Sequence, residues 1–244
     1  MRNYEEEIRQ RTAFIRRMLE EAHGEGIVFG NSGGKDCALV GALCRMACEN
    51  VTGVIMPCQS RRNYQEDAQD ALASAEKFGF RTLRVDVTSA KEALAGEIEK
   101  CCGISHMAGI NMNPRLRMIV LYTIAQSGNC LVAGTGNRSE RSMGYFTKWG
   151  DGACDFNPIG DLTATEVFEF LRYLDAPQHI IEKAPSAGLY DGQTDEQEMG
   201  IAYADLDRYL LTGEGAPEVK ARVDGTLIRT AHKRRMPPVF GEEQ

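Results

Sequence analysis

The chain has 244 residues, of which 43% are hydrophobic and 26% charged, as in an ordinary soluble domain with a buried core. A formal net charge of −7 argues against a nonspecific nucleic-acid binder. The acidic N-terminus lacks the apolar core of a signal peptide, and no apolar stretch is long enough to span a bilayer, so we expect a soluble, cytoplasmic protein without a membrane partner.

The first half of the chain alternates between helical and strand patterns. It begins with an amphipathic helix over 5–22, and further helices are predicted over 36–49, 64–78, 89–102 and 113–126, the last opened by Asn113 and Pro114. Strands are predicted over 27–29, 51–56, 81–87 and 130–133. This alternation predicts an α/β fold with an open, mostly parallel sheet and helices on both faces. Such sheets bind ligands at the carboxyl ends of their strands.

The second half has fewer strand signals. Residues 136–160 are Gly-rich and are predicted to be irregular, and residues 184–195 are predicted to form a mobile loop. Thr163 and Glu166 have the spacing of a capping box for a helix over 164–174. The charged segments 196–211 and 216–233 are predicted to be helical. Because no repeat or linker divides the chain, we expect a single domain over 1–244.

The eight cysteines contain no Cys-x-x-Cys pair, and the four histidines are scattered along the chain. A structural zinc site needs such ligands close together. We therefore expect reduced and mostly buried thiols, as is usual in the cytosol.

The turn after the first predicted strand carries the clearest chemical signal. Segment 30–37 joins a strand to a helix and contains Gly33 and Gly34, which allow the backbone to approach a ligand. The following helix directs N–H groups and the positive end of its dipole at the same place, so we expect anion binding. The turn is not a Walker A loop, because Phe29 stands where that motif needs a glycine and Asp36 where it needs a hydroxyl.

Several motifs in order carry a resemblance to known families. The segment Ser32-Gly33-Gly34-Lys35-Asp36 resembles the pyrophosphate loop of the N-type ATP pyrophosphatases. Nearly the whole chain resembles the ammonia-dependent NAD synthetases, in the segments 114–118, 134–140, 144–152, 155–158, 183–187, 195–196 and 232–238. The run Gly144-Tyr145-Phe146-Thr147-Lys148 and the tail His232-Lys233-Arg234 are specific to this family among the pyrophosphatases. The resemblance implies a Rossmann-like fold of the adenine nucleotide alpha hydrolase type.

The resemblance also implies a ligase that forms a C–N bond in two steps. The carboxylate of nicotinic acid adenine dinucleotide (deamido-NAD) attacks the α-phosphate of ATP, which gives an acyl adenylate and pyrophosphate. Ammonia then displaces AMP and gives NAD. We expect no glutaminase domain, because 244 residues leave no room for one, so ammonia must be free or come from a separate chain.

The family's functional residues can be carried over where the motifs match. ATP would contact Gly30, Asn31, Ser32, Gly33, Gly34, Lys35, Asp36, Cys37, Thr135 and Ser186. Mg²⁺ would be held by Asp36 and Glu140, because hard carboxylates suit that ion. Deamido-NAD would contact Arg115, Lys148, Asp155, His232 and Lys233. Asp151 would lie near the ammonia, where an anion favours ammonium and can take a proton, so we expect Asp151 and Lys148 to be catalytic.

Each of these residues also has a structural interpretation. Arg115 and Arg117 on a helix are ordinarily a solvated face, and Glu140 can cap a turn. Asp151 and Asp155 are common turn residues. The assignment therefore depends on the joint order and spacing of the motifs. The family is also homodimeric, and the apolar face of the helix over 113–127 would form either that contact or core: Leu116, Ile119, Val120, Tyr122 and Thr123.

The chain departs from the family pattern at three positions. Lys35 replaces an apolar residue, and Cys37 replaces a serine, although a thiol is a weaker hydrogen-bond donor than a hydroxyl. Ala164 stands where the family usually has a lysine that reaches the ATP phosphates. We hypothesise that Lys35 supplies part of this missing charge from the other side of the site.

Two other functions stay open at this point. A tRNA thiolase or a GMP-synthetase-like enzyme would use the same loop, and Lys35 is common in thiolase loops. Thiolation, however, needs a basic face or paired cysteines, which this acidic chain lacks. A nucleotide sensor without turnover is favoured by Cys37 and Ala164.

Overall fold

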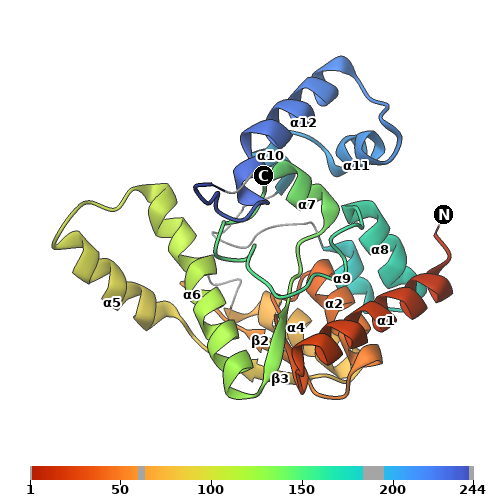
Figure 1. Ribbon diagram of the computed structural model, residues 1–244, viewed down its shortest axis with the longest axis horizontal. Coiled ribbons are helices and arrows are strands. Elements are labelled where there is room, and N and C mark those ends of the chain that lie inside the picture. Colours follow the sequence, from red (N-terminus) through yellow and green to blue (C-terminus); the bar gives the residue numbers. More distant parts are fainter. Residues whose placement is uncertain (1, 60–63, 184–194, 242–244) are drawn as a thin grey trace.

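A four-stranded parallel sheet lies at the centre of the computed structural model, which describes residues 2–59, 64–183 and 195–241. The strands are β1 (Gly26–Gly30), β2 (Val51–Ile55), β3 (Arg81–Arg84) and β4 (Cys130–Ala133). They lie in the order β3-β2-β1-β4, with all neighbours parallel. The predicted open parallel α/β sheet is therefore confirmed (Figure 1).

The strand order places a switch point between β1 and β4. From β1 the chain continues to β2 and β3 on one side, and it then returns to β4 on the other side. Phe29 is paired with Ala133, so the two strands end side by side. A crevice at the carboxyl ends of the strands is expected at such a point, and both Gly-rich turns emerge there.

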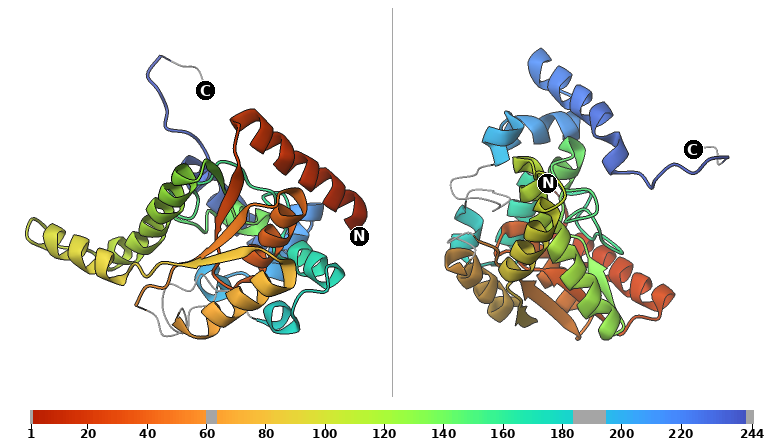
Figure 2. Two further views of the ribbon diagram at one scale, coloured as in Figure 1. Left: turned by 90° about the horizontal axis from the view of Figure 1, so that it is seen from below. Right: turned by 90° about the vertical axis from the view of Figure 1, so that its left-hand side faces the viewer.

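Helices cover both faces because side chains alternate along β1. Ile27 and Phe29 pack in the core beneath α1 (Tyr4–Ala22), α2 (Lys35–Ala47) and α8 (Ala164–Tyr173). Val28 belongs to a separate core that α6 (His106–Ser127) covers. Full burial of each such side chain stabilises the fold by about 1.5–3 kcal/mol. Helix α4 (Glu66–Phe78) packs beside α2, and α5 (Thr88–Glu99) projects from the body with α6 (Figures 1 and 2).

Helix α6 begins earlier than the sequence pattern predicts. Its N-cap is Ser105, whose side chain accepts the Ala108 N–H at 3.3 Å. Pro114 lies inside the helix, where it removes one backbone hydrogen bond because proline has no N–H. A Cβ at Gly150 would lie 3.0 Å from the Pro114 Cβ, so the buried ring packs against a glycine. The predicted start at Asn113 was wrong, because proline also fits a helix whose N-terminus lies upstream.

The second half of the chain contains more short helices than predicted. Segment 136–160 includes α7 (Arg138–Met143), and the predicted helix over 196–211 is split at Gly200, which has a φ of 62°. The remaining helices are α9 (Gln178–Glu182), α10 (Asp195–Met199), α11 (Tyr203–Thr212), α12 (Pro217–Arg229) and the 3-10 turn η1 (Ala231–Lys233). The predicted capping box of Thr163 and Glu166 is confirmed.

Two sequence predictions concern residues outside the ranges that the structure describes. The loop predicted over 184–195 lies almost wholly outside the described residues, as does Ser186. All eight cysteines are free thiols, as expected, but the prediction that most are buried was wrong. Only Cys37, Cys44 and Cys58 are buried, whereas Cys101 and Cys102 are exposed and the other three are half-buried. Within 2–59, 64–183 and 195–241, no helix combines the length and the apolar character needed to cross a membrane.

Candidate active site

A cavity of about 1060 Å³ opens at the carboxyl ends of β1 and β4. It extends between α6, the loop after α7 and the C-terminal segment. Its lining includes most of the residues singled out in the sequence: Gly30, Asn31, Ser32, Gly34, Lys35, Asp36, Cys37, Thr135, Glu140, Lys148, Asp151 and Lys233. Side chains from distant parts of the chain therefore meet in one place, which is the candidate active site.

The turn after β1 is held by α4. Asn31 is buried, and its Nδ2 donates to the Ala71 carbonyl at 3.0 Å while its Oδ1 accepts the Gly33 N–H at 3.3 Å. Gly33 has a φ of 76°, and a Cβ there would lie 2.3 Å from the Asp67 carbonyl oxygen. Only glycine fits this position. The turn is thus fixed in one conformation, with the N-terminus of α2 directed at the cavity.

Ser32 and Cys37 lie together in this turn. The Ser32 Oγ is 3.2 Å from the Cys37 Sγ and accepts the Gly34 N–H at 3.4 Å. Burial raises the pKa of the Cys37 thiol. Cys37 is therefore a neutral thiol at the phosphate turn and is poorly suited to act as a nucleophile.

The turn after β4 continues directly into α7. The Asn137 Oδ1 accepts the Glu140 N–H at 3.0 Å, and the Glu140 carboxylate accepts the Asn137 N–H at 3.1 Å. This capping box stabilises the short helix α7, which the Gly-rich sequence of 136–160 did not predict. The Asn137 Nδ2 also donates to the Asp36 Oδ1 at 3.0 Å, which ties the two turns together. Glu140 thus caps α7 and lines the cavity as well.

Lys35 and three carboxylates form a buried charge cluster. Lys35 is 6% exposed, and its Nζ binds the Asp36 Oδ2 at 2.6 Å. Burial alone would lower the pKa of Lys35, but the charges of Asp36, Glu140 and Asp195 raise it. Burial, together with the charge of Asp36, holds the pKa of Glu140 well above its usual range. The proximity of Asp36 therefore disfavours ionisation of Glu140, and a divalent cation bound between the two would favour the ionised form of both.

Asp36 and Glu140 therefore fit the chemistry of a Mg²⁺ site. Hard carboxylate oxygens are the protein ligands that Mg²⁺ prefers, and the ion commonly takes its remaining ligands from phosphates and water. In the part of the chain that the structure describes, no three carboxylate, thiol or imidazole side chains are arranged to hold a metal ion by themselves. The two carboxylates would thus share the ion with a bound nucleotide.

The Lys35 side chain reaches toward α8 and α11. Its Nζ lies 5.5 Å from the centroid of the Phe168 ring and 5.7 Å from that of Tyr203. Ala164 is fully buried and lies four residues before Phe168, on the same face of α8. The Lys35 ammonium is therefore close to the region that a longer side chain at position 164 would reach.

Asp151 and Lys233 form a second pair of opposite charges in the cavity. The Asp151 Oδ1 accepts the Thr147 N–H at 2.9 Å. Asp151 is exposed to the open cavity, yet the surrounding protein partly desolvates its carboxyl and so raises its pKa, against the effect of Arg117 and Lys233. Burial lowers the pKa of Lys233, whose Nζ donates to two backbone carbonyls at 2.8 Å. A carboxylate of raised pKa is suited to accept a proton near neutral pH.

Three of the residues expected to bind deamido-NAD lie next to one another. An Arg115 Nη donates to the Lys148 carbonyl at 3.5 Å, and the Lys148 Nζ donates to the His232 carbonyl at 2.8 Å. Arg115 and His232 are exposed and do not line the cavity, whereas Lys148 does. Asp155 also lies outside the lining. It accepts the Val132 N–H at 2.7 Å and so holds the end of β4.

Sequence reasoning gave no role to several residues that the fold brings into the site. Arg117 was interpreted as part of a solvated face, yet it lines the cavity and its Nε donates to the Met56 carbonyl at 3.0 Å. Asp195 accepts a hydrogen bond from the Tyr203 hydroxyl at 3.0 Å, and its negative charge helps to raise the pKa of Lys35. Asn137 joins the two turns. All three residues lie in segments that carry the family resemblance, and Asn137 and Glu140 also have the spacing of a capping box, but these signals assigned no role to any of the three.

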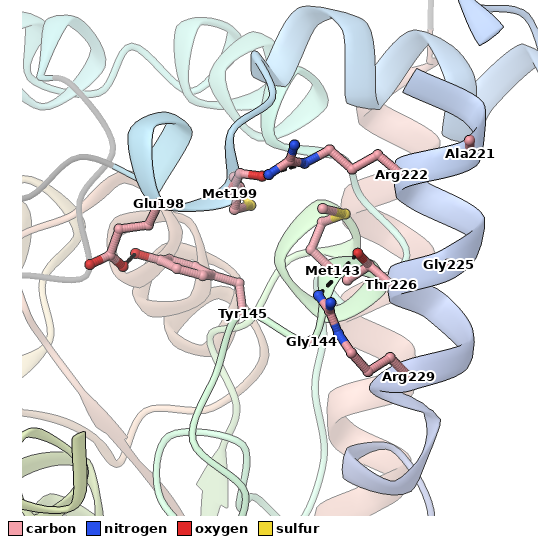
Figure 3. Close-up of a pocket in the computed structure, with 10 residues that line it drawn as sticks. All are labelled: Met143, Gly144, Tyr145, Glu198, Met199, Ala221, Arg222, Gly225, Thr226 and Arg229. Atoms are coloured by element: carbon pink, nitrogen blue, oxygen red, sulfur yellow. Dashed lines mark hydrogen bonds between the residues drawn. The ribbon is translucent and has the colours of Figure 1, made fainter. Parts of the chain in front are cut away.

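A second cavity, of about 560 Å³, adjoins the first. Tyr145 and Glu198 line both cavities, and the Tyr145 hydroxyl donates to the Glu198 carboxylate at 2.5 Å (Figure 3). On the far side, Arg222 and Arg229 extend from α12. The Arg222 Nε donates to the Met199 carbonyl at 2.8 Å, which fixes α10 against α12. The Tyr145–Glu198 pair therefore separates the main cavity from the α12 side.

Known proteins resemble this chain over nearly its full length. The family model for NAD synthase matches residues 7–237. The NH(3)-dependent NAD(+) synthetase of Carboxydothermus hydrogenoformans is 46% identical, over 97% of this chain and 98% of its own length. The protein of the same name from Archaeoglobus fulgidus is 44% identical, over 97% of both chains.

Two solved structures extend this similarity to three dimensions. The NMN synthetase from Francisella tularensis has a TM-score of 0.92 and 34% identity, and the alignment covers 99% of this chain and 100% of that chain. The NH3-dependent NAD synthetase from Campylobacter jejuni has a TM-score of 0.80 and 29% identity, covering 98% of this chain and 100% of that one. Because the family model and these relatives span nearly all of it, the chain belongs to the NAD synthase family.

Proposed function

We propose that this protein amidates deamido-NAD with ammonia at the expense of ATP, giving NAD, AMP and pyrophosphate through an acyl adenylate. One observation carries this proposal: the phosphate turn and the Asp151–Lys233 pair line a single cavity of about 1060 Å³. Pockets for one small ligand usually enclose about 300–1,000 Å³. The cavity lies at the upper end of this range, and it joins the phosphate turn to the Asp151–Lys233 pair, so the reacting ends of ATP and a nicotinate nucleotide could meet in it.

The phosphate end of the cavity would bind ATP. The backbone of the turn after β1 and the N-terminus of α2 offer N–H groups to phosphate oxygens. Asp36 and Glu140 would hold Mg²⁺, which supplies positive charge to the phosphates when bound. The closed conformation of the turn, fixed by Asn31 and Gly33, positions the α-phosphate for attack by the nicotinate carboxylate.

The other end of the cavity would bind ammonium and remove a proton from it. Ammonium has no lone pair, so it must lose a proton before it can attack the acyl carbon. Asp151 would take this proton, since its raised pKa makes it a better base than an ordinary aspartate. Ammonia then forms the C–N bond, and AMP leaves with the electrons of the broken C–O bond. Lys148, with Arg115 and His232 beside it, would bind the substrate's phosphates at the rim.

A second candidate acceptor is nicotinic acid mononucleotide. The structure with a TM-score of 0.92 is described as an NMN synthetase, and mononucleotide and dinucleotide carry the same reacting carboxylate. We retain deamido-NAD as the leading acceptor, because the relatives with 46% and 44% identity are named NAD(+) synthetases.

One assay tests the function and separates the acceptors. The protein is mixed with ATP, Mg²⁺ and ammonium, and with either deamido-NAD or nicotinic acid mononucleotide, and the amide product and AMP are measured. We expect kcat/KM to be higher with deamido-NAD. A higher value with the mononucleotide would reassign the substrate, and no amide from either acceptor would contradict the proposal and favour a nucleotide sensor. Glutamine replaces ammonium in a further arm, in which we expect no product.

We also propose that the protein works as a homodimer through α6. The predicted apolar face of this helix is divided: Val120 and Tyr122 pack against the core, while Ile119 is 54% exposed. Met107, on the first turns of the same helix, is 61% exposed. A dimer contact would cover these side chains. Sedimentation equilibrium is expected to show a dimer, and a monomer at micromolar concentrations would contradict this.

Exchanging the charge between positions 35 and 164 is expected to preserve activity. Lys35→Ala should lower kcat/KM for ATP about 10- to 100-fold, as expected for the loss of a hydrogen bond made by a charged group. Lys35→Ala combined with Ala164→Lys should regain most of it, because the new ammonium would reach the space beside Phe168 and Tyr203 that Lys35 vacates.

The single variant Ala164→Lys is the control for this exchange. Position 164 is fully buried, so the added side chain overpacks the core while Lys35 is present and should lower the free energy of unfolding by about 1–3 kcal/mol. Thermal unfolding and steady-state kinetics measure both effects. A double variant no more active than Lys35→Ala would refute the charge exchange.

A further inference from the structure

Lys183 lies at the edge of the main cavity, held by two carboxylates of α4. Its Nζ is 2.7 Å from the Asp67 Oδ1 and also binds the Asp70 carboxylate. The His179 imidazole lies 3.4 Å from the other oxygen of Asp70. These side chains are mostly buried apart from His179, since Lys183 is 17% exposed and Asp67 is 12% exposed. Lys183 and Asp67 both line the cavity.

The part of α4 that carries Asp67 and Asp70 packs directly against the phosphate turn. A Cβ at Gly33 would lie 2.3 Å from the Asp67 carbonyl oxygen and 2.9 Å from the Asp70 Cβ. Asp67 lines the same cavity as the turn. An anion bound by the turn would therefore face the negative charge of this aspartate unless a cation stood between them.

Three other lysines of the cavity are engaged elsewhere. Lys35, the lysine of the turn itself, is buried and paired with Asp36, with its ammonium against the Phe168 and Tyr203 rings. Lys148 and Lys233 bind backbone carbonyls in the other part of the cavity. Lys183 carries a flexible side chain on the α4 side of the turn, where it binds Asp67 and Asp70.

We propose that Lys183 is a phosphate-binding cation of the ATP site, which Asp67 and Asp70 hold beside the turn until ATP or pyrophosphate takes over its ammonium. This inference rests on the proposed use of ATP. In the adenylation step, the bond between the α-phosphorus and the bridging oxygen breaks and its electrons leave with pyrophosphate. An ammonium on the β- and γ-phosphates stabilises this leaving group. Asp67 and Asp70 are then positioning residues, because they act through Lys183.

Pyrophosphate binding tests this role without any turnover. Trp149 is the single tryptophan of the chain and lines the cavity, so its fluorescence can report binding of pyrophosphate with Mg²⁺. We expect Lys183→Met to raise the Kd for pyrophosphate about 10- to 100-fold, the cost of a hydrogen bond to a charged group. Lys183→Arg should restore part of the affinity. Lys77→Met is the matched control, since Lys77 also pairs with an aspartate, Asp175, but lies outside the cavity lining.

Asp70→Asn gives a result of opposite sign. It removes one competitor for the Lys183 ammonium, so the Kd for pyrophosphate should fall about two- to fivefold, as for the loss of one modest ion pair. A lysine that merely fastened α9 to α4 would behave differently. Both Lys183→Met and Asp70→Asn would then lower the melting temperature and leave the Kd unchanged, and this result would overturn the proposal.

Lys183→Arg and Asp70→Asn keep the test informative if Lys183→Met does not fold. Should Lys183→Met be unfolded by circular dichroism, Lys183→Arg and Asp70→Asn still decide, and unchanged affinity in both would overturn the proposal. Failure of the proposed function gives a different pattern. The native protein would then bind pyrophosphate and respond to these substitutions, but would form no amide from either nicotinate nucleotide.

Discussion

Asp151→Asn is expected to lower kcat for amide formation about 10²- to 10⁴-fold, the usual contribution of a general base. The substitution keeps the oxygen that accepts the Thr147 N–H, so the local turn should persist. It removes the group that we expect to take a proton from ammonium. Steady-state kinetics with saturating ATP and deamido-NAD measure the effect.

The pH dependence distinguishes proton transfer from a role in shape. Burial raises the pKa of Asp151, so activity of the native enzyme should fall as the pH is lowered through a pKa higher than that of an ordinary aspartate. In Asp151→Asn this acidic limb should disappear. A variant that kept both the limb and at least a tenth of the native kcat would rule out Asp151 as the base.

The same substitution should not destabilise the protein at neutral pH. A carboxyl whose folded-state pKa is raised binds more protons when folded than when unfolded, so stability falls as the pH rises through that interval. Native Asp151 therefore costs stability above its pKa, and asparagine removes the cost. Denaturant unfolding at pH 7 should show equal or higher stability for the variant, which would separate lost chemistry from lost fold.

Asp36→Asn is expected to lower kcat/KM for ATP about 10²- to 10³-fold, comparable to removing a group that stabilises charge in the transition state. Asp36 lies at the first turn of α2, binds the Lys35 ammonium at 2.6 Å and accepts a hydrogen bond from Asn137. An amide cannot offer a charged oxygen to Mg²⁺, so half-saturation should require a higher Mg²⁺ concentration.

Two measurements check the Asp36 result. Activity is titrated with Mg²⁺ at fixed ATP, and the rise in melting temperature caused by ATP with Mg²⁺ is compared with that of the native protein. Asp205→Asn serves as the control, because the Asp205 side chain is half-exposed on α11. Among the ion pairs of the described residues it pairs only with Arg208, three residues later. An unchanged Mg²⁺ requirement in Asp36→Asn would contradict its assignment as a ligand.

The fold could be predicted where local chemistry determines it. Most strands were recognisable as short apolar runs next to glycine or proline, and the strand at 81–87 was recognisable by its alternation. The capping box of Thr163 and Glu166 marked α8 correctly. Helix α7 was missed because six residues are too few for a hydrophobic period to appear. The predicted helix over 196–211 missed its break at Gly200, where Arg222 from a later helix occupies the space that a side chain would need.

The site could be predicted only in part, for a related reason. The turn containing Ser32 and Gly33 is a contiguous motif, so its ligand class is readable from sequence. The cluster around Lys35 depends on Asp195, which is 160 positions further along the chain. Lys183 likewise meets α4 only through the tertiary fold. No local sequence pattern predicts these long-range contacts, because they arise from the strand order and the helix packing.

The side chain of Asn137 limits which substitutions the second turn can accept. Its oxygen caps α7, and its nitrogen binds Asp36 in the first turn. A replacement must therefore offer an acceptor and a donor side by side at the end of one short side chain. Aspartate would set a carboxylate against Asp36, and alanine would lose both bonds. In a library of all substitutions at position 137, we expect activity to be retained only by side chains that can both accept and donate a hydrogen bond in this way. The start of α7 and the geometry of the nucleotide site therefore depend on the same side chain, so a substitution at position 137 would change both together.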